Sequence, residues 1–352
     1  MSATLIPSDP PSEVYDVGLY DLDGVIYLGD APVEHAVQAV PAAAARGLRP
    51  LYVTNNSSRE PEEIAAQISG FGVHCSPEQI VTSAQSVAIL LADVVEPGAR
   101  ILVVGGAGLR TAVRQAGFTV VESADDAPAA VVQGFAPDLS WGDLAEAAYA
   151  IGAGAKHVAT NLDGSIPKER GIAPGNGALV GAVVQATGVE PIASGKPLPA
   201  IYHQAAERLH ANRPLAIGDR LDTDLEGARA ADMPGLLVLT GVASARDVVL
   251  APARQRPALL AVDLRGLFEA HPGPEPGAEG WWRCGTAEAR VAADTIELAE
   301  QGRRRRLVPE DPQPVSLDGW RAACVAAWAA ADRGHPLRPQ DVPELTVTST
   351  GQ

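Results

Sequence analysis

Three short clusters of acidic, hydroxyl and amide residues carry the chemistry that this sequence can perform. They are Asp21-Leu22-Asp23-Gly24, Thr54-Asn55-Asn56 and the acidic stretch from Gly218 to Asp224. Each cluster directly follows a short apolar run that predicts a β-strand. Ligands bind outside the carboxyl ends of the strands in open α/β sheets, so we expect the three clusters to meet in one crevice.

The first cluster can divide two chemical roles between its two carboxylates. Asp21 is ionised at neutral pH and can act as a nucleophile toward phosphorus. Gly24 lets the chain turn, so Asp23 can face a leaving group and protonate it. Because the carboxylates repel each other and a phosphate, the site needs a cation. Mg²⁺ fits, since it takes carboxylate, water and phosphate oxygens, and Asp219 supplies the second carboxylate.

The remaining candidates would bind the phosphate. Thr54 and the amides that follow it, with Asn55 and Asn56, would donate to phosphate oxygens, and Lys196 would neutralise charge on the phosphoryl group. Lys196 is one of only three lysines in the chain. Alone it would be an ordinary surface lysine, but the adjacent glycine and proline restrict its backbone.

The elements that must position these residues alternate along the chain. Apolar runs predict strands over 14–20, 48–53, 100–104, 119–122, 130–133, 157–160, 215–217 and 236–239. Ala-rich or amphipathic stretches predict helices over 33–46, 109–115, 144–151, 198–210 and 224–231. Strands that alternate with helices indicate parallel sheets with helices on both faces, which makes the fold class α/β with a doubly wound core.

The chain changes in character after about Phe268. Residues 271–280 are so rich in proline and glycine that we expect a linker without regular structure. Beyond it, 281–299 predicts one or two strands and 317–333 predicts an amphipathic helix, which together make a small α+β module. Four of the five tryptophans fall in this module and predict a packed core. The run from Arg303 to Arg306 is expected to form a solvated hairpin or loop.

Composition limits the partners and the location. The 352 residues predict two to three domains, and the net charge of −16 argues against a nucleic-acid partner. A single cation can still reverse the field inside one cleft. The three cysteines suggest no disulfide framework, and neither a signal peptide nor an apolar run of membrane-spanning length is visible. We therefore expect a cytoplasmic protein without membrane insertion, and leave open whether it forms a homo-oligomer.

The clusters together resemble the haloacid dehalogenase-like phosphatase superfamily. The matching motifs are DLDGV from Asp21, Thr54 in VTNNSSR, Lys196 in ASGKP and GDRLDTD from Gly218. Their order and spacing are similar to the subgroup with a large cap between the second and third motifs, which includes 4-nitrophenylphosphatase-like and phosphoglycolate phosphatases. The resemblance covers about residues 13–268.

The resemblance implies a role for each matched residue. Asp21 would form an aspartyl-phosphate, and Asp23 would serve as general acid and then as general base. Mg²⁺ would be held by the Asp21 carboxylate, the Asp23 main-chain oxygen and the Asp219 carboxylate. Asp224 would lie behind these ligands and orient a metal-bound water or Lys196. An acid at position 23 favours a phosphatase over a dehalogenase.

The resemblance also implies a domain plan. A discontinuous catalytic core would comprise 1–85 and 189–268, with an inserted α/β cap over 86–188. A linker over 269–280 and the α+β module over 281–352, of unknown role, would follow. In the cap, Asn161 and Asp163 match a recurrent T-N-x-D segment that would contact substrate or position the cap; a turn before Gly164 is the alternative.

The substrate implied is a small phosphorylated metabolite. The core joined to a C-terminal extension of this size looks like actinobacterial glycerol-3-phosphate phosphatases, which makes glycerol 3-phosphate the expected substrate. Phosphoglycolate, pyridoxal phosphate or a broad set of phosphomonoesters are alternatives within the class. Phosphoryl transfer, as in the superfamily's mutases, and a binding or regulatory protein acting through its C-terminal module are alternatives outside it.

Overall fold

The chain divides into two compact units. The computed structural model describes residues 5–168, 170–309 and 312–348. The first unit comprises Met1–Pro50 and Leu209–Gln352, and the second comprises Leu51–Arg208. Each unit contains parallel strands with helices packed on them, so the predicted α/β class is confirmed.

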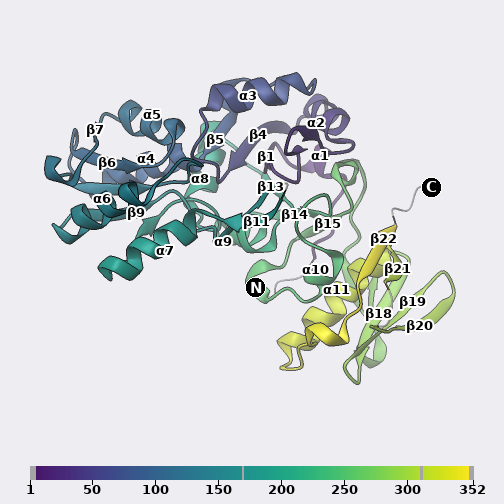
Figure 1. Cartoon of the computed structure of the whole chain (residues 1–352). Helices are drawn as coiled ribbons and strands as arrows, with labels where there is room; N and C mark the ends of the chain where they lie inside the picture. The colour runs from purple at the N-terminus through teal and green to yellow at the C-terminus, as the bar shows by residue number, and fades with distance from the viewer. Residues whose placement is uncertain (1–4, 169, 310–311, 349–352) are drawn as a thin grey trace. The chain divides into compact units, whose positions relative to one another are not determined.

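The first unit contains four parallel strands in the order β15-β14-β13-β1 (Figure 1). Their bounds are Leu259–Ala261 for β15, Gly235–Val238 for β14, Pro214–Gly218 for β13 and Val17–Tyr20 for β1. These short apolar runs are almost wholly buried, as strands covered on both faces must be. Because the strands are parallel, their carboxyl ends lie along one edge.

Short elements complete this part of the first unit. They are α1 (Pro11–Val14), β2 (Tyr27–Leu28), β3 (Ala31–Pro32), α2 (Ala36–Ala45), α9 (Glu226–Ala230) and α10 (Ala245–Val249). Gly47, at φ 108°, follows the end of α2 as predicted. The strand predicted from residue 14 begins only at Val17, because Pro11 starts a helical turn that includes Val14.

The second unit contains a parallel sheet in the order β12-β9-β8-β6-β7. Its strands are β6 (Arg100–Val104), β7 (Thr119–Val121), β8 (Ala130–Gln133), β9 (Lys156–Ala159) and β12 (Ile192–Ala193). The helices of the unit are α3 (Pro61–Gly70), α4 (Ser83–Val94), α5 (Ala107–Gln115), α6 (Trp141–Gly152), α7 (Asn176–Thr187) and α8 (Ala200–Arg208). Strand β4 (Arg49–Thr54) passes from the first unit into the second and pairs in parallel with β5 (Ile80–Thr82).

Helices cover both faces of the sheet in the second unit. Ile101 and Val103 of β6 pack in a cluster with side chains of α4 and α5. Leu102 and Val104 point the other way and pack with side chains of α6 and α7. This alternation follows from the two-residue period of a strand, and it confirms the predicted arrangement of helices on both faces.

One hairpin of the second unit is not anticipated by the sequence analysis. It pairs β10 (Ser165–Lys168) with β11 (Gly171–Pro174) directly after the loop that contains Asn161 and Asp163. Its residues Gly171 and Ile172 are exposed. The segment therefore lacks the alternation of buried and exposed residues that would reveal a strand.

The C-terminal part of the first unit is a five-stranded antiparallel sheet with one long helix, α11 (Leu317–Asp332), against it (Figure 1). The strands are β16 (Pro274–Pro276), β17 (Trp282–Cys284), β18 (Ala287–Ala292), β19 (Thr295–Glu300) and β20 (Arg303–Leu307). Two further strands pair in parallel with each other: β21 (Gln313–Ser316), which precedes α11, and β22 (Leu345–Thr348), which follows it. The predicted α+β module and its long helix are confirmed.

The expectation of a linker without regular structure over 271–280 was wrong at its centre. Pro274–Pro276 forms edge strand β16 and pairs with Trp282–Cys284. Prolines are tolerated there because an edge strand leaves one side of its backbone unpaired. The arginine run at 303–306 is the outer strand of a hairpin with β19, one of the two forms expected for it.

The C-terminal helix shares a hydrophobic core with the sheet of the first unit. Leu237 of β14 and Leu260 of β15 belong to the same buried cluster as Trp320 and Trp328 of α11. The indole Nε1 of Trp320 donates to the Ala245 carbonyl and that of Trp328 to the Val248 carbonyl, each at 2.9 Å. The predicted tryptophan-rich core is therefore present, and it is continuous with α10.

No helix within the described parts of the chain has the length and apolar character needed to cross a membrane.

Candidate functional site

Three carboxylates of the first unit lie close together. Asp21 follows β1, Asp219 follows the neighbouring strand β13, and Asp224 lies one turn later in the π-helical turn η3 (Leu221–Leu225). One carboxylate oxygen from each lies within 4.8 Å of the others. The amide of Asp21 donates to the Ile217 carbonyl at 2.8 Å, so the two strand ends are in register. The structure thus brings the first and third acidic clusters of the sequence to one edge.

Glycines make the room that this arrangement needs. Gly24 has a φ of 84°, and a Cβ built on it would lie 2.5 Å from Oδ2 of Asp219. A Cβ on Gly241 would overlap the same carboxylate, and one on Gly218 would overlap the side chain of Asp224. Larger residues at these three positions would displace the carboxylates, so the glycines shape the site without contributing a functional group.

Asp219 is buried and is contacted by the main chain of the loop after β14. It is 1% exposed, and its Oδ2 accepts a hydrogen bond from the Val242 amide at 2.6 Å. Its main-chain carbonyl accepts from the Ala243 amide at 3.1 Å. The loop after β14 therefore fixes this side chain through main-chain donors, which a sequence pattern does not reveal.

Of the three acids of the fourth motif, Asp219 and Asp224 are buried and Asp222 is exposed. Oδ2 of Asp224 accepts from the Arg220 amide at 3.1 Å, which turns the buried carboxylate back toward Asp219. Asp222 is exposed and instead pairs with the Arg220 guanidinium at 2.8 Å. The turn η3 thus sends alternate acids in different directions, and Asp224 joins the carboxylate group.

Asp23 differs from Asp21 in exposure. Asp21 is half-buried, whereas Asp23 is exposed in the turn that follows. The Gly24 amide donates to the Tyr27 carbonyl at 2.8 Å, and the left-handed conformation at Gly24 reverses the chain there. The two carboxylates therefore stand in different surroundings, as two different chemical roles require.

The donor set suits a hard divalent cation. Three carboxylates so close together repel one another, and a bound cation relieves that repulsion. Carboxylate oxygens are the ligands that Mg²⁺ takes, usually one or two of them together with water and a substrate phosphate. The group Asp21, Asp219 and Asp224 can therefore hold such an ion.

The other predicted residues gather in the second unit around Asn55. Its Nδ2 donates to the Lys196 carbonyl at 3.0 Å and to the Asp163 carboxylate at 3.1 and 3.2 Å. Its Oδ1 accepts from the Lys196 amide at 2.8 Å. Nδ2 of Asn161 donates to the Asn55 carbonyl at 2.8 Å. One side chain thus joins the end of β4, the loop after β9 and the segment after β12.

Thr54 and Asn56 shape the loop that leaves β4. Thr54 is buried, and its Oγ1 accepts from the Asn56 amide at 3.1 Å. Oδ1 of Asn56 accepts from the amides of Ser58 and Arg59 at 3.0 and 3.1 Å. The Asn56 side chain is therefore engaged in a tight turn of its own loop.

Asn161 and Asp163 form a turn and also reach beyond it. Oδ1 of Asn161 accepts from the Asp163 amide at 3.2 Å, which is the turn that the alternative interpretation expected. Asn161 is also buried and holds the Asn55 carbonyl, and the Asp163 carboxylate accepts from Asn55. The pair positions the loop before β10.

Lys196 is 2% exposed, and its backbone is tightly enclosed. A Cβ on Gly195 would lie 2.5 Å from the Thr160 carbonyl and 2.7 Å from Oδ1 of Asn55. The alternative of an isolated surface lysine, which the sequence analysis did not favour, does not hold, because the segment that carries Lys196 is packed against two others.

Sequence reasoning missed three partners of these residues. Val242 donates to Asp219 through its main chain, which no residue type can signal. Ser83 Oγ donates to the Asn55 carbonyl at 2.7 Å, and Asn176 Nδ2 donates to the Asn161 carbonyl at 2.8 Å. Ser83 and Asn176 are buried polar residues in the first turns of α4 and α7. Their position just after a predicted strand or loop is the signal that could have found them.

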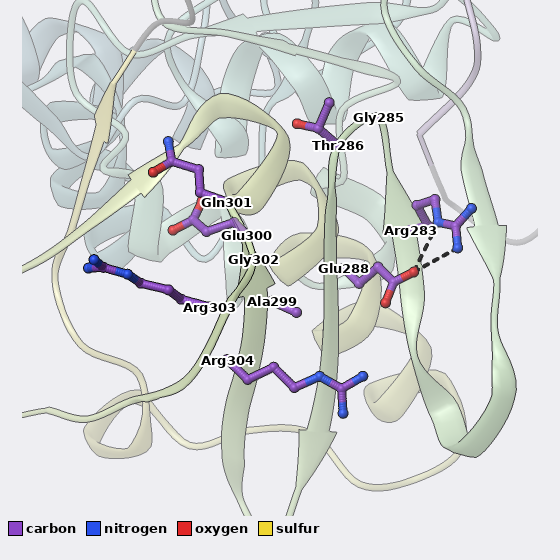
Figure 2. A pocket seen from close by; sticks show the side chains of 10 residues that line it. All are labelled: Arg283, Gly285, Thr286, Glu288, Ala299, Glu300, Gln301, Gly302, Arg303 and Arg304. Atoms are coloured by element: carbon purple, nitrogen blue, oxygen red, sulfur yellow. Dashed lines mark hydrogen bonds and ion pairs between the residues drawn. The ribbon is translucent and has the colours of Figure 1, made fainter.

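A separate hollow of about 280 Å³ lies on the C-terminal sheet (Figure 2). Its lining includes the turn at Gly285 and the turn at Gln301, and Arg283 pairs at 2.8 Å with Glu288 on the adjacent strand. Arg303 and Arg304 on its rim are exposed. Arg283, Glu288, Arg303 and Arg304 are thus surface groups or paired with a neighbour, whereas Asp219 and Asp224 are buried.

Comparison with known proteins relates the chain to a group of hydrolases. A family model described as haloacid dehalogenase-like hydrolase matches residues 18–119, and a second, described as HAD-hydrolase-like, matches 193–267. The chain is 46% identical over 301 residues to D-glycerol 3-phosphate phosphatase of Mycobacterium tuberculosis, covering 83% of each protein. It is 36% identical over 236 residues to an acid sugar phosphatase of Staphylococcus saprophyticus, covering 66% of this chain and 90% of that protein.

Solved structures of phosphatases are also similar to this chain. The glycerol phosphate phosphatase of M. tuberculosis in complex with magnesium superposes with a TM-score of 0.80 at 38% identity, covering 98% of this chain and 96% of that one. A thermostable NPPase from Geobacillus stearothermophilus superposes with a TM-score of 0.64 at 32% identity, covering 71% of this chain and 96% of that one.

Proposed function

The chain belongs to the haloacid dehalogenase-like hydrolases, and we propose that it is a Mg²⁺-dependent phosphatase that hydrolyses glycerol 3-phosphate to glycerol and phosphate. The observation that carries the proposal is the close approach of Asp21, Asp219 and Asp224 at the carboxyl ends of β1 and β13. The choice of substrate is supported by the 46% identity to the glycerol 3-phosphate phosphatase of M. tuberculosis.

The proposed ligands of Mg²⁺ are the carboxylates of Asp21 and Asp219 and the main-chain oxygen of Asp23. Asp224 lies within 4.8 Å of the other two carboxylates and would hold a water of the ion in place. When bound, the ion offsets the carboxylate charges and draws electron density from a phosphate oxygen, as a Lewis acid does.

In the first proposed step, a carboxylate oxygen of Asp21 attacks the phosphorus atom. A new bond forms between Asp21 and phosphorus while the bond from phosphorus to the glycerol oxygen breaks. The departing oxygen takes the electron pair, and Asp23 donates a proton to it. The exposed position of Asp23 supports this role, because a proton donor must reach a leaving group that faces solvent.

In the second step, the Asp21–phosphate bond is hydrolysed. The Asp23 carboxylate, now without its proton, accepts a proton from water while the water oxygen attacks phosphorus. The bond to Asp21 breaks, the Asp21 carboxylate recovers its electron pair, and phosphate leaves. The same residue is therefore the acid of the first step and the base of the second.

We assign the phosphate contacts to the second and third motifs. The Thr54 hydroxyl and the amides that follow it would donate to phosphate oxygens, and the Lys196 ammonium would balance their charge. Uncatalysed hydrolysis of phosphate monoesters is so slow that enhancements reach ~10²¹-fold, so several such contacts must act together in the transition state.

The cap and the cellular location are part of the proposal. The predicted cap, residues 86–188, would select the group attached to the phosphate, and its Asn161 and Asp163 would position the loop that does so. Cys75, Cys284 and Cys324 are free and buried, which supports a reducing compartment such as the cytoplasm.

A panel of phosphomonoesters tests the proposal. Phosphate release would be measured with Mg²⁺ and after chelation, for glycerol 3-phosphate, 2-phosphoglycolate, pyridoxal phosphate and a hexose phosphate. We expect activity only with the metal and at least a tenfold preference in kcat/KM for glycerol 3-phosphate, which corresponds to about 1.4 kcal/mol.

The outcomes separate the class from the substrate. A preference below tenfold would contradict glycerol 3-phosphate as the dedicated substrate. Unchanged rates after chelation would contradict the requirement for Mg²⁺. Phosphate release that falls when an acceptor alcohol is added, while glycerol release does not fall, would indicate phosphoryl transfer in place of hydrolysis.

A further inference from the structure

The side chain of Asn55 uses all of its hydrogen-bonding groups within the protein. A primary amide has two hydrogens on nitrogen and one acceptor oxygen. One Nδ2 hydrogen serves the Lys196 carbonyl at 3.0 Å, and the other serves the Asp163 carboxylate at 3.1 and 3.2 Å. Oδ1 accepts from the Lys196 amide at 2.8 Å. Both hydrogens are engaged, so the side chain is not placed to donate to a substrate.

The orientation of this amide is fixed by its neighbours. Oδ1 must face the Lys196 N–H, and Nδ2 must face the carboxylate of Asp163, because a flipped amide would place donor against donor and oxygen against oxygen. The main chain of Asn55 is held as well: its carbonyl accepts from Asn161 Nδ2 at 2.8 Å and from Ser83 Oγ at 2.7 Å. Asn55 is therefore a fixed point of the second unit.

Lys196 depends on this point for its position. Asn55 bonds both the amide and the carbonyl of the same residue, which leaves that peptide segment little freedom to rotate. Gly195 allows the close approach, since a Cβ there would lie 2.7 Å from Oδ1 of Asn55. Lys196 is 2% exposed, so its enclosure and the two hydrogen bonds to its backbone both limit its movement.

We propose that Asn55 is a positioning residue that clamps the backbone of Lys196 and ties it to Asp163 of the loop after β9, and that it acts on the phosphate only through Lys196. The inference rests on the proposed role of Lys196 in phosphate binding. It departs from the sequence-based assignment of the Asn55 side chain as a substrate ligand. It also gives Asp163 a function, since the carboxylate of this residue, in the loop before β10, accepts a hydrogen bond from the Asn55 side chain and helps to fix its orientation.

The clamp itself is tested without any substrate. Hydrogen exchange of the Lys196 amide would be followed in the wild-type protein, in Asn55→Ala and in Asn212→Ala, a control at an exposed asparagine of the first unit. Loss of the acceptor oxygen should speed exchange at Lys196 at least tenfold in Asn55→Ala and leave it unchanged in the control. Equal exchange in all three proteins would overturn the clamp, whatever the enzyme does.

A double-mutant cycle then tests whether Asn55 acts through Lys196. Displacement of a catalytic group by about 1 Å can cost ~10²-fold in rate, so we expect Asn55→Ala to lower kcat by about that factor while KM changes less than threefold. In a Lys196→Ala background the same substitution should cost less than threefold, because the residue that it positions is gone. An equal cost in both backgrounds would show a direct contact with substrate and would overturn the inference.

The two proposals fail in different ways. If the wild-type protein releases no phosphate from any phosphomonoester, the proposed function is contradicted. The hydrogen-exchange experiment then still tests whether Asn55 holds the backbone of Lys196. If the wild-type enzyme is active and Asn55→Ala has the same kcat, the proposed effect of Asn55 on catalysis is contradicted, and the proposed phosphatase activity is not. Thermal unfolding of each variant shows whether a lost rate comes from lost structure.

Discussion

The two groups of polar residues in this molecule differ in how their charges and hydrogen bonds are balanced. In the first unit, Asp21, Asp219 and Asp224 bring like charges within 4.8 Å. In the second unit, the amides of Asn55 and Asn161 form hydrogen bonds that satisfy one another and the backbone. The first group could hold a cation, whereas the hydrogen-bonding groups of the two amide side chains in the second are satisfied within the protein. We infer that one is built to do chemistry and the other to hold a shape.

The largest expected effect is the loss of catalysis when a carboxylate of the first group is replaced. Asp21→Asn removes the nucleophile while keeping the size of the side chain, so kcat for phosphate release should fall by ~10³-fold or more. The melting temperature should not fall, because one of several repelling charges is removed.

The matched control for this substitution is Asp222→Asn, at an exposed acid of the same motif that pairs with Arg220. Its kcat should stay within twofold of wild type, since exposed ion pairs contribute little. Retention of more than a tenth of wild-type turnover in Asp21→Asn would sink the nucleophile assignment.

Acid should affect the first unit before the second. Burial, and then the nearby Arg321 guanidinium, lower the pKa of His271 from 6.5 to about 4. Its Nε2 donates to the Gly266 carbonyl at 2.9 Å and its Nδ1 accepts from Arg321 at 3.1 Å, so a second proton has no acceptor there. Burial also lowers the pKa of His157 in the second unit. Both nitrogens of that ring face oxygens, which can accept from its charged form.

The direction of the pH effect follows from proton binding. Between pH 6.5 and about 4 the unfolded chain binds a proton at His271 that the folded chain excludes. The stabilisation is therefore complete above pH 6.5 and is lost as the pH falls toward 4, by about 3 kcal/mol in all. Urea unfolding at pH 7 and pH 4.5, with wild type and His271→Gln, measures it. Equal pH dependence of the two proteins would contradict the prediction.

Two glycine substitutions should distinguish the carboxylate group from the group around Asn55, with smaller effects than the preceding substitutions. A Cβ on Gly241 would displace the Asp219 carboxylate, so Gly241→Ala should raise the Mg²⁺ concentration for half-maximal rate about tenfold. A Cβ on Gly195 would instead push on Asn55 and Thr160. Gly195→Ala should lower kcat and leave the Mg²⁺ requirement within twofold.

The control for the glycine pair is Gly152→Ala, where a Cβ would meet open space. Rates of phosphate release across a Mg²⁺ titration give both parameters for all three variants. A Mg²⁺ requirement that shifts as much in Gly195→Ala as in Gly241→Ala would contradict the assignment of the metal site to the carboxylate group alone.

The sequence predicted best what depends on local apolar patterns. The strands over 100–104 and 130–133 have the predicted bounds, because each contains an unbroken run of aliphatic residues. The long C-terminal helix was predicted to within one residue of Asp332, since the apolar stripe is regular and Gly334 follows. The order of the motifs after strands likewise placed Asp21 and Asp219 at one sheet edge.

What the sequence could not predict depends on contacts between distant residues. Strand β16 was missed because its pairing with β17, and not its composition, makes Pro274–Pro276 a strand. The partners of Asn55, Lys196 and Asp163, lie far away in the chain, so the motif around Asn55 does not predict these hydrogen bonds. The backbone donor at Val242 has no counterpart in any sequence motif.

The most direct test of the central claim is calorimetric titration of Mg²⁺ into the wild-type protein and two variants. We predict one Mg²⁺ per chain in wild type, binding at least thirtyfold weaker in Asp219→Asn, and wild-type affinity in Asn55→Ala. The first change removes a charged oxygen ligand, and the second loosens a network that holds no metal. Unchanged Mg²⁺ affinity in Asp219→Asn would contradict the assignment of the carboxylates at β1 and β13 as the metal site.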